Sequence, residues 1–342
     1  MTKNFQDYLT SIIDGYDLNN EQMDNVMTLI MTGKLSSSQI AAFMVGIRIK
    51  GESIDEIASA AKVMRYHSNK VILNNCDYLI DTCGTGGDSL QTFNVSTISA
   101  IIASAAGARV AKHGGRSVSS KCGSADVLEK IGVNVNLTHE QISQLVDKIG
   151  IGFMFAPNYH PAMKHVAPVR KELGIRTFFN LLGPLTNPAN ALSQVVGVYN
   201  QKLCSTFAHV LNILGSNHVM VVSGNDGMDE ISITGPTFIA ELKDKTITEY
   251  SIKPEDFNLP LGSLEDIKVE NVEESEHIIK HILQGEPSTA RNIAILNAGS
   301  AIYISGLTQD LQAGVKKAAK IIDEGSAIAK LNELIKESNK YD

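Results

Sequence analysis

The chain has 342 residues, of which 43% are hydrophobic and 20% charged, a composition typical of a globular protein with room for about two domains. Its 30 basic and 37 acidic residues give a formal net charge of −7, which disfavours a protein that binds nucleic acid through many phosphates. The four cysteines lack Cys-x-x-Cys spacing, so neither a disulfide scaffold nor a zinc finger is expected. No signal peptide or membrane span is expected either, and we predict a cytoplasmic protein.

The first seventy residues are predicted to form short helices and no strand. Ser36 is placed to cap a helix over Gln39–Ile49. Ser53 and Glu56 form a capping-box pattern, in which each side chain bonds the backbone N–H of the other residue. We expect the helix that begins there to end near His67.

Strand and helix patterns alternate after residue 77. The predicted strands are Tyr78–Asp81, Arg109–His113, Phe153–Ala156, Val195–Tyr199 and Val219–Ser223, with a hairpin over Phe238–Ile252. The predicted helices are Ser96–Ala106, Val127–Ile131, Glu140–Ile149 behind a Thr138 cap, Leu203–Leu214, Glu274–Leu283, Ser288–Ser305, Gln309–Asp323 and Ser326–Glu337. This alternation predicts an α/β fold, a small all-helical part followed by a larger part with a mostly parallel central sheet.

A glycine-rich segment, Gly84 to Asp88, follows the first predicted strand. Its glycines let the backbone come close to a ligand, and its N–H groups, with those of the helix start beyond it, can bind an anion. The spacing matches neither the dinucleotide-binding fingerprint nor the P-loop. An ordinary tight turn is the alternative. Asp88 favours a ligand site, because a carboxylate beside a phosphate needs a bridging cation.

A second polar segment, Lys112 to Lys121, follows the next predicted strand. It holds three cations, three hydroxyl side chains and two glycines within ten residues. Arginine offers a planar fork and lysine a point charge to a phosphate. A solvated basic loop is the alternative, but such a loop does not need the hydroxyls and glycines.

The adjacent carboxylates Asp229 and Glu230 follow the turn Gly224 to Gly227. Neighbouring residues of a regular strand point to opposite faces, so we expect this pair at the irregular entrance of a strand, where both can reach one site. Two carboxylates near a phosphate suit Mg²⁺. The alternative interpretation, an exposed acidic turn that binds no metal, is also possible on this pair alone. His160 and His165 are expected to have structural roles, and no residue pattern indicates covalent catalysis.

Together these motifs resemble the anthranilate phosphoribosyltransferases of tryptophan biosynthesis, a nucleoside-phosphorylase-like, class III phosphoribosyltransferase family. The resemblance covers nearly the whole chain in order and spacing. It rests on GTGGD at Gly84–Asp88, NVST at Asn94–Thr97, KHGGRSVSSKCGSADVLE at Lys112–Glu129, HPAMKHVAPVRKELGIRTFFNLLGPLTNP at His160–Pro188, and the Asp229–Glu230 pair.

The resemblance implies transfer of the phosphoribosyl group of 5-phosphoribosyl 1-pyrophosphate (PRPP) to anthranilate, with two Mg²⁺ ions and release of pyrophosphate. It also implies a helical domain of residues 1–72 plus about 170–190 and an α/β domain of residues 73–169 plus 191–342. The site would lie in the cleft between them. Neither nucleic acid nor membrane is an expected partner, and a homodimer through the helical domain is expected.

Site residues are carried over by position. The PRPP residues are Gly84, Gly87, Asp88, Thr92, Asn94, Val95, Ser96, Thr97, Lys112, His113, Gly114, Gly115, Arg116, Ser117, Val118, Ser119, Ser120 and Ser124. The anthranilate residues are Gly84, His113, Gly115 and Arg170, and the metal ligands are Ser96, Asp229 and Glu230, with Asp88 as a further candidate. No general acid or base is expected; Lys112, Arg116 and Mg²⁺ would stabilise the transition state.

The chain departs from the family pattern at Gly115, where the usual motif has an Asn that contacts anthranilate. Two explanations are open: a contact is lost, or the backbone there needs a positive φ that suits glycine. A pyrimidine nucleoside phosphorylase is the alternative function, and Asp229-Glu230 and the stretch from Val166 to Thr177 argue against it. The net charge and the metal residues argue against a catalytically silent relative that binds nucleic acid.

Overall fold

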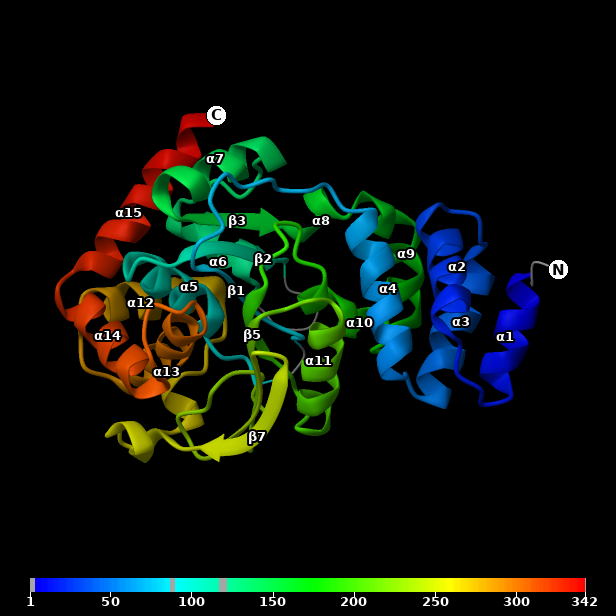
Figure 1. Ribbon diagram of the computed structural model, residues 1–342. Helices are drawn as coiled ribbons and strands as arrows, with labels where there is room; N and C mark the ends of the chain where they lie inside the picture. The colour runs from blue at the N-terminus through cyan, green and yellow to red at the C-terminus, as the bar shows by residue number, and fades with distance from the viewer. Residues whose placement is uncertain (1–3, 87–89, 117–121, 342) are drawn as a thin grey trace.

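The computed structural model describes residues 4–86, 90–116 and 122–341. The chain begins with four helices, α1 (Phe5–Ile13), α2 (Asn20–Met31), α3 (Ser37–Lys50) and α4 (Ile54–Tyr66). They stand at one side of the molecule (Figure 1). Each begins at a capping box, including the predicted Ser36 and Ser53 caps, which are confirmed.

The described residues form a sheet of seven strands in the order β3-β2-β1-β4-β5-β6-β7. The strands are β1 (Leu79–Gly84), β2 (Arg109–Gly114), β3 (Ile151–Phe155), β4 (Ser193–Gly197), β5 (His218–Gly224), β6 (Thr237–Lys243) and β7 (Thr246–Ile252). Strands β1 to β5 pair in parallel. The last two are antiparallel and form the predicted hairpin, whose turn residues Asp244 and Lys245 both have positive φ, as a type I′ turn requires. The mostly parallel sheet is confirmed.

The remaining helices surround this sheet and link it to the N-terminal helices. They are α5 (Val95–Ala105), α6 (Ser124–Ile131), α7 (His139–Ile149), α8 (Ala156–Tyr159), α9 (Ala167–Leu173), α10 (Phe179–Leu182), α11 (Lys202–Ile213), α12 (Val272–Leu283), α13 (Thr289–Ile304), α14 (Leu311–Asp323) and α15 (Ser326–Ser338). Short 3₁₀ turns occupy Pro161–His165, Gly183–Leu185, Pro254–Phe257, Leu264–Asp266 and Asn339–Tyr341.

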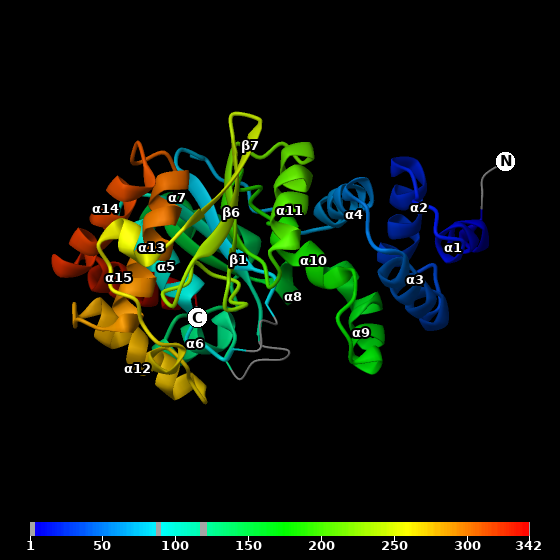
Figure 2. The same cartoon turned by 90° about the horizontal axis from the view of Figure 1, so that it is seen from below.

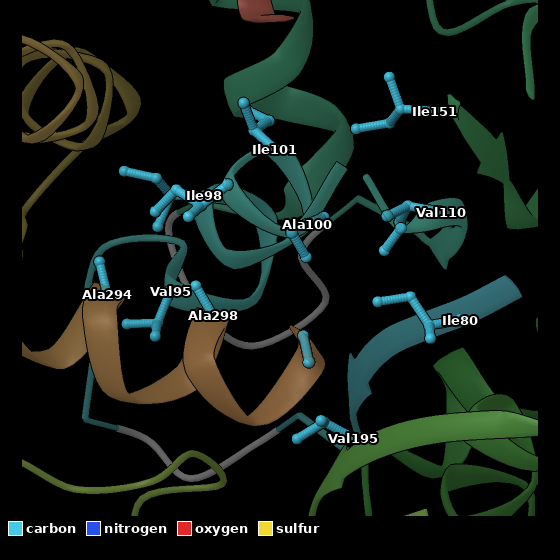
Figure 3. Packing of buried hydrophobic residues seen from close by; sticks show 14 of the residues in the cluster. Ile80, Val95, Ile98, Ala100, Ile101, Val110, Ile151, Val195, Ala294 and Ala298 are labelled. Atoms are coloured by element: carbon cyan, nitrogen blue, oxygen red, sulfur yellow. The ribbon is translucent and has the colours of Figure 1, made fainter. Parts of the chain in front are cut away.

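Two hydrophobic cores share the sheet, one on each face. On one face, Ile98 of α5 and Ala294 of α13 pack together with strand residues such as Ile80 and Val195 (Figure 3). The neighbouring residue Val196 belongs to the other core, because successive side chains of a strand point to opposite faces.

The second core joins the other face of the sheet to the N-terminal helices. It contains Val196 of β4 and Phe207 of α11, together with Phe43 of α3 and Phe178. Helix α11 packs on α4, while α9 packs on α3 and α10 on α4, so the chain returns to the N-terminal helices between β3 and β4 (Figure 2). No helix among the described residues is both long and apolar enough to cross a bilayer.

Candidate active site

The carboxyl ends of β1 and β4 lie side by side at the point where the strand order reverses, which is where open α/β sheets bind ligands. A pocket of about 210 Å³ opens at this edge. It is lined by Cys83, Gly84, Gly86, Gln91, Thr92, Phe93, Asn94, Val95, Ser96, Lys112, His113, Gly114, Gly115, Cys122, Ser124, Asp229 and Glu230. The fold therefore brings all three predicted motifs to one pocket.

Several expected site residues do not line this pocket or lie outside the described residues. Gly87, Asp88, Ser117, Val118, Ser119 and Ser120 lie outside the described residues. Thr97 lies in α5 and is buried, and its hydroxyl has no hydrogen-bond partner among the described residues. Arg116 and Arg170 are not among the pocket-lining residues.

The Asp229 carboxylate packs against the end of β1. Its Oδ2 accepts a hydrogen bond of 2.8 Å from the backbone N–H of Gly86. The expectation that Asp229 and Glu230 stand at the entrance of a strand is wrong, since they lie in the irregular segment after β5, well before β6 begins at Thr237. Because the two residues do not lie in a regular strand, their side chains need not point to opposite faces, and both line the same pocket.

Gly197, at the end of β4, makes this placement possible, although it is not among the site residues predicted from the sequence. A Cβ atom at Gly197 would lie 1.5 Å from the carbonyl oxygen of Asp229. The Gly197 carbonyl also accepts a hydrogen bond from the N–H of Thr85 at 2.9 Å. Gly197 thus joins the glycine-rich segment to the acidic loop. The available signal was a glycine within a strand pattern, which often marks a close backbone approach.

Substitution of Gly197 by Ala is expected to displace the acidic loop. Overpacking of this kind costs about 1–3 kcal/mol of stability, and we expect kcat to fall a few-fold as Asp229 moves. Thermal melting and steady-state kinetics of the variant would check this. A Gly197→Ala protein with unchanged melting temperature and kcat would show that the two segments do not need this approach.

Lys112 supplies a buried positive charge at the base of the pocket. Its side chain is almost fully buried, and its Nζ donates to the carbonyl of Thr82 and to Ser96 Oγ, the latter at 3.1 Å. Burial lowers the pKa of Lys112, while the negative charges of Asp81 and Glu230 act to raise it. The charge is held by β1 and α5 and is not a mobile surface group.

Arg116 is directed toward α6 in this structure. Its guanidinium pairs with Asp126 at 2.7 Å and with Glu129 at 2.6 Å, and it lies over the ring of Phe155. Two carboxylates three residues apart on one helix face suffice to hold it there. The sequence pattern around Arg116 did not reveal this pairing.

His113, which lines the pocket, forms a buried pair with His160, and their ring centroids are 5.0 Å apart. Burial, the neighbouring His160 and Lys112 lower the pKa of His113 to about 3, and burial and Lys70 lower that of His160 to about 4. Both rings are therefore neutral at pH 7. Each bonds a backbone group, of Gly183 and Thr186 respectively, and neither Nε2 has a partner among the described residues.

The family relationships of the chain agree with this geometry. The a/b domain of a glycosyl transferase family matches residues 77–328, and the helical bundle domain of that family matches residues 6–68. Anthranilate phosphoribosyltransferase of Methylobacillus flagellatus is 54% identical over 326 residues, covering 95% of this chain and 96% of the relative. That of Vesicomyosocius okutanii is 51% identical, covering 98% of this chain and 99% of the relative. The chain belongs to the anthranilate phosphoribosyltransferase family.

Solved structures of this family share the whole fold. Anthranilate phosphoribosyltransferase from Thermus thermophilus superposes with a TM-score of 0.92 at 37% identity, covering 97% of this chain and 99% of that one. The Saccharomyces cerevisiae enzyme in complex with PRPP and Mg gives a TM-score of 0.90 at 26% identity, with 98% of each chain covered. The family membership and the fold expected from the motifs are confirmed.

Arg170, which the resemblance predicts to face anthranilate, lies on α9 and is not among the pocket-lining residues. Pro168 stands in the first turn of this helix, and Gly174 ends it. The Arg170 side chain is half-buried, and burial lowers its pKa. It makes no ion pair within the part of the chain that the structure describes. A partly buried guanidinium without a carboxylate favours binding of an external anion.

Five further pocket residues were not assigned from the sequence: Cys83, Gly86, Gln91, Phe93 and Cys122. Cys83 lies near the end of β1. Phe93 is buried, and Gln91 has a positive φ. Nothing in residue type or spacing marks Gln91 or Cys122 as pocket residues, because their positions depend on how the loops fold together.

Proposed function

We propose that this chain transfers the phosphoribosyl group of PRPP to the amine of anthranilate, giving N-(5-phosphoribosyl)anthranilate and pyrophosphate. One observation carries the proposal: Asp229, Glu230, Ser96 and buried Lys112 converge on the pocket where α5 begins. The complexes of the yeast relative with PRPP and Mg and with 4-fluoroanthranilate support it.

The pocket residues fit Mg²⁺ bound together with a phosphorylated substrate. The described residues contain no group of three or more His, Cys, Asp or Glu side chains that could hold a metal. Mg²⁺ often takes only one or two carboxylates and completes its shell with water and substrate oxygens. Asp229, Glu230 and the Ser96 hydroxyl would hold two such ions, with Asp88 as a further candidate. Bound there, Mg²⁺ supplies positive charge to the pyrophosphate group.

The chain's own residues then orient the two substrates. Lys112 adds a fixed positive charge, and the N–H groups at the start of α5 favour an anionic oxygen. Arg170 would bind the anthranilate carboxylate, and Gly84, His113 and Gly115 would face the same substrate. Because an aromatic amine is mostly unprotonated at pH 7, a placed nucleophile suffices and no general base is required.

Two assembly features belong to the same proposal. We assign residues 1–72 and about 170–190 to the helical domain, and packing of α9 on α3 and of α10 on α4 supports this division. We assign a homodimer through the helical domain in a cytoplasmic enzyme. Large exposed apolar side chains on or next to α1 and α3 support the dimer: Ile13, Tyr16 and Ile49, the last 81% exposed.

The assay that tests the function follows the loss of anthranilate fluorescence with PRPP and Mg²⁺. Thymidine phosphorolysis is measured beside it. Anthranilate loss that depends on both PRPP and Mg²⁺ is the expected result. Phosphorolysis of thymidine without anthranilate turnover would instead support the nucleoside phosphorylase alternative.

The structure separates the two explanations for Gly115. Its φ is not among the positive values given for the described residues, and a Cβ atom there would meet no described residue within 4 Å. This argues against the backbone explanation and supports that of a lost side-chain contact. Glycine leaves space, which a bridging water can fill.

Gly115→Asn is accordingly expected to lower the anthranilate KM by about two- to tenfold, as one neutral hydrogen bond would. The PRPP KM and the melting temperature should stay unchanged. Steady-state kinetics with each substrate varied and thermal melting would check this. A lower melting temperature with weaker binding of both substrates would contradict the lost-contact explanation.

A further inference from the structure

Asn94 stands at the start of α5 but does not cap that helix. In α1 to α4 the residue before the helix has ψ between 158° and 172°, and its side chain accepts a backbone N–H of the first turn. Asn94 has ψ of 76°, and its side chain makes no such bond. The backbone N–H of Ser96 consequently has no partner among the described residues, and Ser96 lines the pocket.

Ser275 holds the Asn94 side chain away from its own helix. Ser275 lies in the first turn of α12 and is fully buried. It contacts Asn94, although the two residues are 181 positions apart in the sequence. Its hydroxyl donates to Asn94 Oδ1 at 2.9 Å and accepts from the Asn94 backbone N–H at 3.3 Å. One hydroxyl therefore fixes both the backbone and the carboxamide of Asn94.

Cys122 completes this arrangement from the other side. Its thiol donates to Asn94 Oδ1 at 2.9 Å, and Asn94 Nδ2 donates to the Cys122 carbonyl at 3.2 Å. With two donors, Oδ1 has used its acceptor capacity. It cannot also accept the N–H groups of α5.

We propose that Ser275 is a positioning residue for the phosphoribosyl substrate. By holding the Asn94 carboxamide against α12, it keeps the backbone N–H of Ser96, at the start of α5, open to an anionic oxygen of that substrate. An uncapped helix start carries partial positive charge and unsatisfied donors, and a capping Asn would compete with the ligand for them. This inference rests on the proposed function, because it takes PRPP as the ligand of the pocket.

Ser275→Ala is expected to raise the PRPP KM about three- to tenfold, the range for one lost hydrogen bond. The anthranilate KM and kcat should change less than twofold, because Arg170 and the acidic pair are untouched. Ser275→Cys, which keeps a donor of similar size, should show a smaller rise in PRPP KM. It also provides a testable protein if the alanine variant does not fold.

Ser300→Ala is the matched control. Ser300 is equally buried, and its hydroxyl donates to the Leu296 carbonyl within α13, away from the pocket-lining residues. If both alanine variants lower the melting temperature and neither raises the PRPP KM, Ser275 has only a structural role and the proposal is overturned.

A double-mutant cycle tests whether Ser275 acts through Asn94. In an Asn94→Ala background, Ser275→Ala is expected to raise the PRPP KM much less than it does alone, since no carboxamide remains to position and only the backbone contact of residue 94 is lost. The same KM rise in both backgrounds would overturn the proposal. If neither the unmodified protein nor Ser300→Ala transfers the phosphoribosyl group to anthranilate, the proposed function itself is refuted. If the unmodified protein is active and Ser275→Ala has an unaltered PRPP KM, only the role of Ser275 is refuted.

Discussion

Joint replacement of Asp229 by Asn and Glu230 by Gln is expected to lower kcat/KM at limiting Mg²⁺ by about a hundredfold or more. Each charged contact contributes about 1.5–3 kcal/mol, and the variant removes two. Both residues are partly exposed in the pocket, so the fold should survive. After the change, the amide oxygen at position 229 can still accept the Gly86 N–H that Oδ2 of Asp229 accepts now.

The matched control for this variant is the adjacent pair Glu255 and Asp256, changed to Gln and Asn. That pair lies in a surface turn after β7, is not part of the pocket, and gives the same change in charge. Turnover measured across a Mg²⁺ titration, with thermal melting for stability, separates metal binding from general charge effects. Near-normal turnover of the Asp229/Glu230 variant at limiting Mg²⁺ would rule out the metal assignment.

Arg170→Ala is expected to raise the anthranilate KM about tenfold or more while the PRPP KM changes far less. A charged hydrogen bond to a carboxylate contributes about 1.5–3 kcal/mol, and a guanidinium fork suits a carboxylate. The guanidinium is half-buried and has no ion pair within the described ranges, so its removal should not lower the melting temperature.

Lys171→Ala provides the control for Arg170. Lys171 is the next residue of α9, carries the same charge and is exposed. Steady-state kinetics with each substrate varied in turn would show the difference. Equal rises in both KM values after Arg170→Ala would mean that this residue binds PRPP or has a structural role.

Local features of the fold could be predicted from the sequence because their signals lie within a few residues. The Ser36, Ser53 and Thr138 caps all form as expected, each as a capping box, since side chain and backbone partner are three residues apart. The alternation of apolar segments likewise located the predicted strands and helices to within a few residues, but it did not reveal the short helices α8 and α10. The predicted and observed boundaries differ most for β1 and α6, where glycines and small residues weaken the periodic signal.

The resemblance of the motifs to a known family also pointed to the residues that line the pocket. Gly84, Ser96, Lys112 and Asp229 do converge there. Residue types and spacing alone supplied only the chemistry: glycines and cations for phosphate, carboxylates for Mg²⁺. They left open whether the acidic pair was an exposed turn.

Only the tertiary structure decided how distant segments meet. Three contacts join residues that no local sequence pattern connects. They are the close approach of Gly197 to Asp229, the ion pairs of Arg116 with α6, and the hydrogen bond of Ser275 to Asn94. The strand order places β4 beside β1, and this pairing sets which loops share an edge. Local spacing encodes helices, strands and caps, whereas the geometry of the site depends on backbone contacts that exist only after the sheet has formed.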